Sequence, residues 1–368
     1  MTSVAVIGTR LPGLRPAPMT RSSLAVVGLA GALGLTACGA PVPSAAPGTL
    51  VVAGYGGSYE EAFKQSVIPD FEKTCGCEVS YIAGSSTDTV AKLKAQQNAP
   101  QIDVALIDDG VQNQAVQAGL LAKLDLKTVT NLPNVIDIAR LPDDVGVGFS
   151  LNATGIAYNT DYFKKNGLAA PKRLADLADP KLKGKLVMPS ITQTYGLGAL
   201  LIAAKVGGGS ESAIDPGFAG VKKVAANAVT FDTTADVSNY FLQGQAVATV
   251  WGNSRVQLLA KKGFPIAFVY PEEGALPLIA TVNVVNKAPH AGLGQKFVNT
   301  LLDPAAQKLM AEVNFNGPTV KGVTLDPALA ERVVGQEHAG ELRKLDWPTI
   351  NKNRSAWTDR WNKEIETS

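Results

Sequence analysis

The sequence is poor in cysteine and histidine and has no extended basic run. Its 368 residues include 3 cysteines, 2 histidines, and 34 basic against 32 acidic residues. With only His290 and His338 to supply imidazole ligands, no metal site or cofactor is expected. The near balance of charge argues against nucleic acid as the main partner. Beyond Leu35, no apolar segment is long enough to cross a membrane.

The N-terminal residues have the features of a bacterial lipoprotein signal peptide. Arg21 is followed by an apolar run from Leu24 to Leu35, and then by the cleavage motif Leu-Thr-Ala-Cys that ends at Cys38. The run is too short to be a permanent transmembrane helix. We therefore predict that residues 1–37 are removed and that Cys38 carries the lipid. Either Met1 or Met19 could be the true start.

Cleavage would also change the net charge. The first 37 residues contain three arginines and no acid, so 34 basic and 32 acidic residues become 31 and 32, a net charge of about −1 with histidine neutral. Residues 38–48 are rich in Pro, Ala, Gly and Ser, which suits a flexible tether. The expected location is extracytoplasmic, with the protein lipid-anchored to the cell membrane and facing outside or the periplasm.

Two further cysteines, Cys75 and Cys77, are spaced as Cys-Gly-Cys at a predicted helix-to-strand turn. In an oxidising compartment they could close a small disulfide ring or stay as two unpaired thiols. A redox role is less favoured, because no thioredoxin-like sequence surrounds them.

An alternation of strands and helices begins at Leu50. The apolar run Leu50–Ala53 predicts a buried strand, and a glycine loop with Tyr55 leads into a helix. Ser58 and Glu61 have the spacing of a capping box at the start of that helix. Further strands and helices follow in turn, which predicts a mostly parallel sheet with helices on both faces. Ligands bind such sheets beyond the carboxyl ends of the strands, here the loops at Tyr55, Ser85 and Asp108.

A second domain is predicted after the long β-rich segment Val145–Asn159. Helices are expected at Thr234–Gln243 and at Arg255–Lys262, the second capped by Ser254. The segment Pro271–Pro277 is predicted to carry the chain back to the first domain. Two such crossings would form a hinge that lets the domains close about a ligand.

Five short motifs in register carry a family resemblance. The chain resembles the spermidine/putrescine-type solute-binding lipoproteins of bacterial ABC importers from about residue 49 to its C-terminus. The motifs are Gly56-Gly57-Ser58-Tyr59-Glu60, Thr154–Asn159, Asp179–Lys185, Trp251-Gly252-Asn253, and Asn316–Thr319 after the predicted helix Gln295–Leu302.

The resemblance implies an α/β, two-lobed type II periplasmic-binding-protein fold. Each lobe is expected to be a mostly parallel sheet flanked by helices, with two hinge crossings. Residues 49–152 and 277–320 would form lobe 1, residues 153–276 lobe 2, and residues 321–368 a C-terminal helical segment packed on the lobes. A monomer that binds a small-molecule solute and delivers it to a permease with a cytoplasmic ATPase is expected.

The solute is expected to bear an amine, but the residues depart from the polyamine pattern. The family's polyamine binders surround the amines with a tryptophan and carboxylates, because ammonium groups favour anions and aromatic faces. Trp251 matches that tryptophan, whereas Asn253 and Asn283 stand where acids are expected. Arg255 could pair with a carboxylate or phosphonate or lie on a solvated helix face. A zwitterionic amino compound is therefore ranked above putrescine or spermidine.

The predicted ligand-binding set combines these positions with polar residues of the loops. Asp108, Asp109, Asp236 and Glu272 are candidate anions, and Tyr195 opens a helix whose N-terminus favours anionic groups. The full set is Tyr55, Gly57, Ser58, Ser86, Asp108, Asp109, Thr154, Tyr195, Asp236, Trp251, Asn253, Arg255, Glu272 and Asn283.

Two other classes of function share this scaffold. An enzyme would need a nucleophile beside a base, and neither cysteine of the Cys-Gly-Cys turn nor either histidine falls in a predicted pocket loop. An enzyme is therefore not expected, and a lobed sensor remains an alternative. In the C-terminal segment, Trp357 and Trp361 are four residues apart, which predicts a helix packed onto the body.

Overall fold

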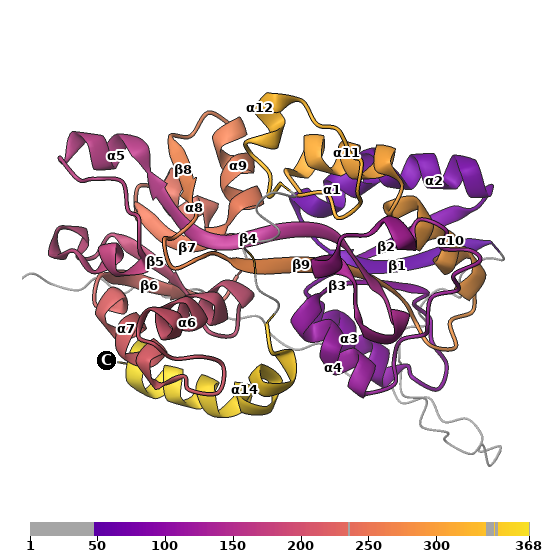
Figure 1. Ribbon diagram of the computed structural model, residues 1–368, viewed down its shortest axis with the longest axis horizontal. Coiled ribbons are helices and arrows are strands. Elements are labelled where there is room, and N and C mark those ends of the chain that lie inside the picture. Colours follow the sequence, from indigo (N-terminus) through magenta and orange to yellow (C-terminus); the bar gives the residue numbers. More distant parts are fainter. Residues whose placement is uncertain (1–47, 235, 336–341, 343–344, 368) are drawn as a thin grey trace, which may run out of the picture. The chain divides into compact units, whose positions relative to one another are not determined.

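The structure is a computed structural model that describes residues 48–234, 236–335, 342 and 345–367. The predicted signal peptide, Cys38, most of the tether and His338 lie outside the described residues. We use lobe 1 for the part built on strands β1 to β3 and lobe 2 for the part built on β5 to β8; the long strands β4 (Val147–Asn159) and β9 (Leu276–Val284) run through both (Figure 1).

Lobe 1 is built on three parallel strands. The central β1 (Thr49–Tyr55) pairs with β2 (Glu78–Gly84) and with β3 (Val104–Asp108). Its apolar residues are buried on both faces because helices cover each side, as parallel strands require. The helices that connect and follow these strands are α1 (Ser58–Gln65), α2 (Val67–Cys75), α3 (Ser86–Ala95) and α4 (Asp109–Gln117).

Both lobes share one sheet with the strand order β2-β1-β3-β9-β4-β7-β5-β6, and β8 also pairs with β4. β9 is antiparallel to both β3 and β4. Lobe 2 contributes β5 (Leu186–Pro189), β6 (Ala228–Asp232), β7 (Ala248–Gly252) and β8 (Ile266–Val269). Its helices are α5 (Thr160–Lys165), α6 (Thr194–Val206), α7 (Asp215–Ala225), α8 (Ser238–Leu242) and α9 (Asn253–Lys261).

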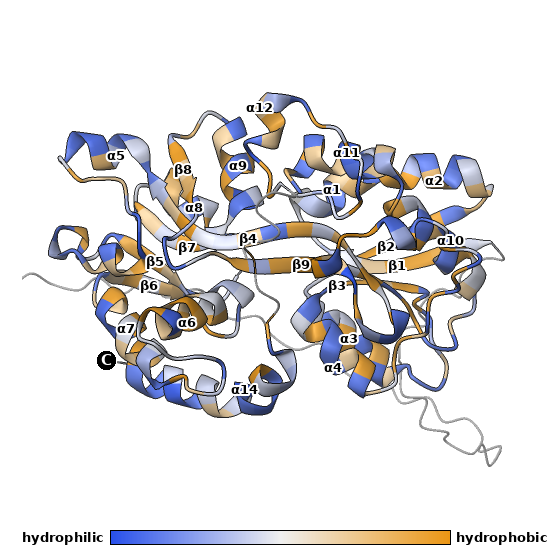
Figure 2. Cartoon of the chain, in the orientation of Figure 1, coloured by the Kyte–Doolittle hydropathy of each residue, from blue (hydrophilic) through white to orange (hydrophobic). Residues whose placement is uncertain are grey.

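The apolar core divides along β4. Residues up to Ala153 pack in the core of lobe 1, whereas Ile156 packs in the core of lobe 2. Figure 2 shows the resulting apolar colouring of β1, β3 and β9, with hydrophilic residues on the outer helices. The chain thus crosses between two separate cores within a single strand.

In the described part of the chain, the helices α10, α11, α12 and α14 follow β9. α10 (Ala291–Leu301) and α11 (Pro304–Asn314) bury Phe297, Leu301 and Met310 in the core of lobe 1, and α12 (Pro327–Ala330) is short. α14 (Trp347–Trp361), which continues into a π-helical turn at Asn362–Glu366, belongs to lobe 2. Its Trp357 and Trp361 are 6% and 0% exposed, so the predicted packing of this pair is confirmed.

Several predicted boundaries were wrong. α1 begins at Ser58 after a Gly57 cap, whose φ of +68° suits glycine, so Ser58 is not the cap residue. A capping box is formed at the start of α3, between Ser85 and Asp88. α9 begins at Asn253 after a Gly252 cap, so Ser254 lies inside the helix. The predicted linker to residue 277 ends early, because Leu276 and Pro277 already pair with β4.

The predicted helix Thr234–Gln243 is shorter than expected, since α8 covers only Ser238–Leu242. Just before it, Asp232 accepts hydrogen bonds from the backbone N–H and hydroxyl of Thr234, which favour a turn over a helix. Cys75 and Cys77 are joined by a disulfide.

Replacing Trp361 by alanine should destabilise the protein by about 3–5 kcal/mol, because a fully buried indole leaves a large cavity in the core of lobe 2. Guanidinium unfolding followed by circular dichroism would measure this loss. The control is Val229→Ala on the edge strand β6, where the side chain is 51% exposed and little change is expected. Equal stability of both variants would contradict the packing of α14 on lobe 2.

Candidate functional site

A cleft of about 820 Å³ lies between the two lobes. The loops after β1, β2 and β3 line it from lobe 1, as their position at the carboxyl ends of parallel strands predicts. The first turns of α6 and α9 line it from lobe 2, and β4, β9 and α14 complete the wall. The side chains used below are Tyr55, Tyr59, Ser86, Asp108, Asn152, Thr194, Tyr195, Arg255, Leu278, Ala280, Trp347, Asn351 and Arg354.

The floor of the cleft is a short piece of the continuous sheet. Ala280 on β9 pairs with Asp108 on β3, and Leu278 two residues earlier pairs with Asn152 on β4. Cross-strand partners project from the same face of a sheet. Asp108 and Asn152 therefore flank the two apolar residues of β9, one on each side.

Asp108 is held by hydroxyl groups from both lobes. The Tyr55 hydroxyl donates to its Oδ1 at 2.8 Å, and Thr194 on α6 donates to its Oδ2 at 3.2 Å. Burial raises the pKa of Asp108, while the hydrogen bonds from Tyr55, Thr194 and Ser86 and the charge of Arg255 lower it in part. The Thr194 contact bridges the two lobes.

Asn152 brings an amide to the opposite side of the floor. Its side chain is only 6% exposed, and its Nδ2 donates to the Ser150 hydroxyl at 3.1 Å. Its Oδ1 has no hydrogen-bond partner among the described residues. An acceptor buried in this way is expected to bind a donor from outside the protein.

Asp109, the neighbour of Asp108, joins lobe 1 to α14. The indole Nε1 of Trp347 donates to its Oδ2 at 2.7 Å. Asn351, one turn further along α14, donates to the Gly110 carbonyl at 3.1 Å. The helices are so close here that a Cβ on Gly110 would lie 2.5 Å from the Trp347 ring. Burial raises the pKa of Asp109 to about 7, with Trp347 opposing and Asp108 adding to the shift.

Arg255 on α9 reaches the cleft from lobe 2. Its Nη1 lies 3.5 Å from a carboxylate oxygen of Asp236, and its side chain is 20% exposed. Burial raises the pKa of Tyr195, and the nearby charge of Arg255 lowers it in part. Of the two positions that the sequence left open for Arg255, the side chain takes the one in the cleft lining, and its charge is shared with an acid of the same lobe.

An aromatic pair forms one wall. The rings of Tyr55 and Tyr59 meet edge to face with centroids 5.0 Å apart. The Tyr59 hydroxyl accepts a hydrogen bond from Asn316 Nδ2 at 3.1 Å. Burial raises the pKa of both phenols, so they stay protonated and can donate or accept hydrogen bonds at neutral pH.

Five of the predicted residues line the cleft together: Tyr55, Ser86, Asp108, Tyr195 and Arg255. In the loop after β1, Gly56 and not Gly57 lines the cleft, and the side chain of Ser58 lies outside the described part of the structure. Asp109 and Asp236 do not line the cleft themselves. Each contacts a residue that does: Asp109 contacts Trp347, and Asp236 contacts Arg255. Glu272 is exposed on the loop between β8 and β9.

The remaining four predicted residues are buried in structural positions. Trp251 is 1% exposed and stacked on Phe241 in the core, where the indole does not line the cleft. Thr154 packs against α6 where Gly198 leaves room for it. Asn283 donates from Nδ2 to the Ala105 carbonyl and to Thr281.

Asn253 completes the hydrogen bonding of the strand β4. Along one edge of β4, Leu151 pairs with Gly317 and Thr154 pairs with Gly252. The N–H of Ala153 lies between these partners and donates to Asn253 Oδ1 at 2.9 Å. The asparagine therefore fills a gap in the strand pairing, a constraint that motif comparison could not reveal.

The sequence reasoning missed Asn152 and the whole contribution of α14. Four residues of α14 line the cleft: Trp347, Asn351, Arg354 and Thr358. Their spacing of four, three and four residues places them on one helix face, beside the face that buries Ile350, Trp357 and Trp361. That stripe was visible in the sequence, but nothing local indicated that it would face the cleft.

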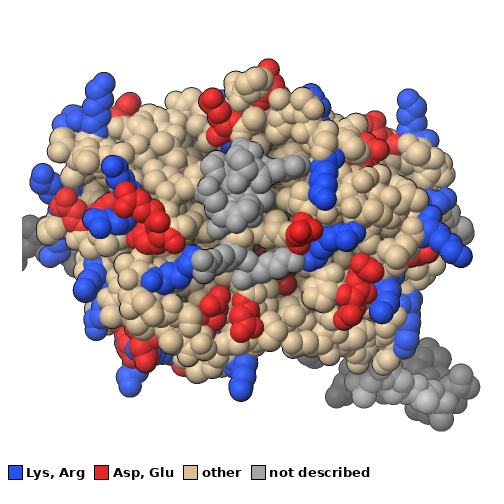
Figure 3. Space-filling view, viewed as in Figure 1, with Lys and Arg blue, Asp and Glu red and all other residues tan. Residues whose placement is uncertain are grey.

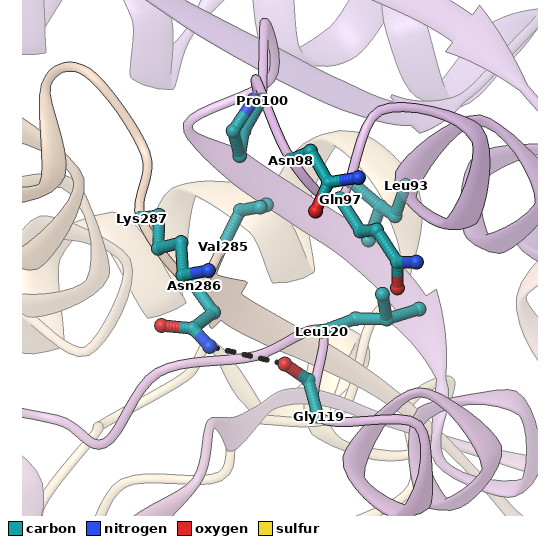
Figure 4. A pocket seen from close by; sticks show the side chains of 9 residues that line it. All are labelled: Leu93, Gln97, Asn98, Pro100, Gly119, Leu120, Val285, Asn286 and Lys287. Atoms are coloured by element: carbon teal, nitrogen blue, oxygen red, sulfur yellow. Dashed lines mark hydrogen bonds between the residues drawn. The ribbon is translucent and has the colours of Figure 1, made fainter.

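Neither a metal site nor a membrane span is found in the described part of the chain. No group of three His, Cys, Asp or Glu side chains there could hold a metal ion. Likewise, none of the described helices is both long and apolar enough to span a bilayer. Acidic and basic side chains intermingle over the face in Figure 3. A second cavity, of about 100 Å³, lies in lobe 1 beside Leu93, Leu120 and Val285 (Figure 4).

Comparison with known proteins places the chain in a family. A family model described as bacterial extracellular solute-binding protein matches residues 66–333. The chain therefore belongs to this family, whose members in ABC transporters bind small molecules and work with a permease and an ATPase. The relatives are binding proteins of transporters and not enzymes.

Relatives by sequence differ in the solute for which they are named. A periplasmic protein of Salmonella typhimurium, named for binding 2-aminoethylphosphonate, is 24% identical over 336 residues, which cover 89% of this chain and 96% of the relative. The spermidine/putrescine-binding periplasmic protein of Escherichia coli is 24% identical over 300 residues, which cover 79% and 84%. The predicted polyamine type is thus not singled out.

Solved structures agree on the fold. An ABC transporter protein of Clostridium perfringens has a TM-score of 0.72 at 25% identity, covering 86% of this chain and 99% of that one. AgtB of Agrobacterium tumefaciens, solved in complex with agropinic acid, has a TM-score of 0.70 at 26% identity, covering 86% and 98%. The predicted two-lobed periplasmic-binding-protein fold is confirmed.

Asp109→Asn should raise stability at pH 8 by about 2 kcal/mol. Each unit of pKa shift corresponds to roughly 1.4 kcal/mol of stability, and partial screening by solvent reduces the total. The folded-state pKa, about 7, lies above the ordinary value of 3.8. The native protein therefore binds more protons than the unfolded chain between these values, and its stability falls as pH rises from about 4 through 7. Asparagine removes this dependence and still offers Trp347 an acceptor.

Thermal melting of both proteins at pH 5 and pH 8 would measure the difference, which should shrink at the lower pH. The matched control is Asp161→Asn, which makes the same substitution at an exposed acid in the first turn of α5. A variant that is less stable than the native protein at pH 8 would refute the assignment.

Proposed function

We propose that the protein is the extracytoplasmic receptor of an ABC importer for a small zwitterionic solute, one with an amine and an anionic group. Capture would occur between the lobes by hinge closure about β4 and β9, followed by delivery to the permease. The observation that carries the choice of solute is the charge of the cleft.

The charged side chains that line the cleft are Arg255, Arg354 and Asp108, and the described residues add no further charge to the lining. The helices α3, α4, α6 and α9 also begin at the cleft, and helix N-termini carry partial positive charge. A dication such as putrescine would meet one carboxylate and two cations. An anionic group on the solute removes this mismatch.

The amine of the solute is assigned to the lobe 1 side of the floor. Asp108 supplies the carboxylate, and the Tyr55 and Tyr59 rings beside it supply aromatic surface, which together suit an ammonium group. The Asn152 oxygen, which has no partner among the described side and main chains, offers a further acceptor for an N–H or O–H of the solute.

The named relatives support this ranking without deciding it. 2-Aminoethylphosphonate, for which the Salmonella relative is named, carries both an amine and an anion. AgtB was solved with an acid. A polyamine remains the second candidate on the strength of the Escherichia coli relative, although it lacks the anion that the cleft charge favours.

Two matched pairs of solutes would test the assignment by calorimetric titration of the purified protein. The zwitterions 2-aminoethylphosphonate and 4-aminobutyrate should each bind at least about 10-fold more tightly than their partners without an anion, ethanolamine and putrescine, since each lost charge-assisted contact costs about 1.5 kcal/mol or more. Tighter binding of putrescine than of 4-aminobutyrate would reverse the ranking. A lack of binding by all four would count against a receptor for amine-bearing solutes.

Asp108→Asn should lower the affinity for the zwitterion that binds best by about 10-fold or more, because the variant removes the charge that faces the amine. Its amide oxygen can still accept from Tyr55, and its amide nitrogen can donate to the Thr194 hydroxyl. The same titration measures it, and Glu272→Gln, an exposed acid outside the cleft, is the matched control. Equal affinities in the two variants would remove Asp108 from the binding site.

The receptor is further proposed to be held at the membrane by lipid on Cys38. Cys38→Ser should move the protein from the membrane fraction to the soluble fraction, because the thiol that would carry the acyl chains is lost. Immunoblots of the two fractions, together with labelling by radioactive palmitate, would measure this. A variant that stays with the membrane as fully as the native protein would exclude the anchor.

A further inference from the structure

Arg354 is the second cation of the cleft and comes from α14. It lines the cleft, and its Nη2 donates to the main-chain carbonyls of Ile191 at 3.0 Å and Thr192 at 3.5 Å. These two residues belong to the loop that leads into α6. The guanidinium is thus fixed beside the start of α6 by one of its nitrogens.

This guanidinium has no counter-charge among the residues that the structure describes. No carboxylate of the described chain lies within ion-pair distance of Arg354, whereas Arg255 has Asp236 at 3.5 Å. On the same helix, Arg360 pairs with Asp215 and with Glu364. Burial lowers the pKa of Arg354, and no neighbouring acid offsets the effect. A partly buried cation without a partner is unfavourable unless something else supplies the anion.

The geometry of the hydrogen bonds also leaves donors for a ligand. The Ile191 and Thr192 carbonyls occupy Nη2, and Nε and Nη1 have no hydrogen-bond partner in the described part of the chain. Planar guanidinium groups bind carboxylate and phosphonate oxygens through two such N–H groups at once.

The N-terminus of α6 also favours a negatively charged group at this place. Its first backbone N–H groups, from Thr194 onward, have no partner within the helix, and the positive end of its dipole points to the cleft. The helix has 13 residues, so this dipole is well developed. Arg354 and the α6 N-terminus therefore favour a negative group in the same part of the cleft.

We infer that Arg354, rather than the predicted Arg255, binds the anionic group of the solute, at a subsite between α14 and the start of α6. The inference rests on the proposed function and deepens it, since it assigns the anion to one place and the amine to Asp108. A solute that fills both places would touch lobe 1 through its amine and α14 through its anion.

The test compares 2-aminoethylphosphonate with ethanolamine, which has the same amine but no phosphonate. Arg354→Gln should weaken binding of 2-aminoethylphosphonate by about 30-fold or more, in the range for truncation of a buried charge pair, and should leave ethanolamine nearly unchanged. Arg354→Lys keeps the charge but loses the planar fork, so its loss should be intermediate. The control is Arg360→Gln on the same helix, where Arg360 faces α7 instead of the cleft.

The ratio of the two affinities separates binding from structure. If Arg354 merely held α14 in place, its loss would weaken both ligands alike, and the inference would be overturned. If Arg354→Gln fails to fold, Arg354→Lys is used in its place. An unchanged ratio of the two affinities in that variant would also overturn the inference. A selective loss of the phosphonate in either variant supports the subsite.

The outcome also distinguishes this inference from the proposed function. Native protein that binds 2-aminoethylphosphonate, with an affinity ratio unchanged in Arg354→Gln, overturns the subsite and leaves the zwitterion receptor standing. Native protein that binds putrescine but neither 2-aminoethylphosphonate, 4-aminobutyrate nor inorganic phosphate overturns both the subsite and the proposed solute. If the native protein binds none of putrescine, 2-aminoethylphosphonate, 4-aminobutyrate and inorganic phosphate, the subsite and the receptor assignment are overturned together.

Discussion

The pairing of β4 with β9 is the constraint on which the rest of the structure depends. Both strands run through the two lobes, so the lobes are joined by backbone hydrogen bonds as well as by a linker. The same ladder places Asp108 and Asn152 on either side of β9 and so builds the floor of the cleft. Because the floor is part of a sheet, its polar groups hold their spacing while the helices above them can move.

Much of lobe 1 could be predicted because its information is local. Apolar runs of strand length, followed by glycine or serine and then a helix, place Tyr55, Ser86 and Asp108 at one edge of a parallel sheet, and the structure brings them together. Local sequence could not show that Trp251 stacks on Phe241, or that Asn253 completes the hydrogen bonding of β4. Such roles depend on partners distant in the chain, which a motif does not contain.

The contribution of α14 also could not be predicted from local sequence. Its polar stripe and its tryptophan pair are both evident in the sequence, and the tryptophans were correctly assigned to packing. Which of its polar residues reach the cleft depends on the surface against which the neighbouring, buried face of the helix packs. Here the buried face docks on lobe 2, which turns Arg354 toward the cleft and sets Trp347 on Asp109 of lobe 1.

The position of α14 in the chain has a consequence for maturation. Apart from the π-helical turn that continues it, this helix follows every other described element, yet it forms one wall of the cleft. A chain made only as far as residue 346 could pair β4 with β9 and form much of both cores, but its cleft would lack this wall. Competence to capture a solute therefore depends on a segment made after the strands of both lobes.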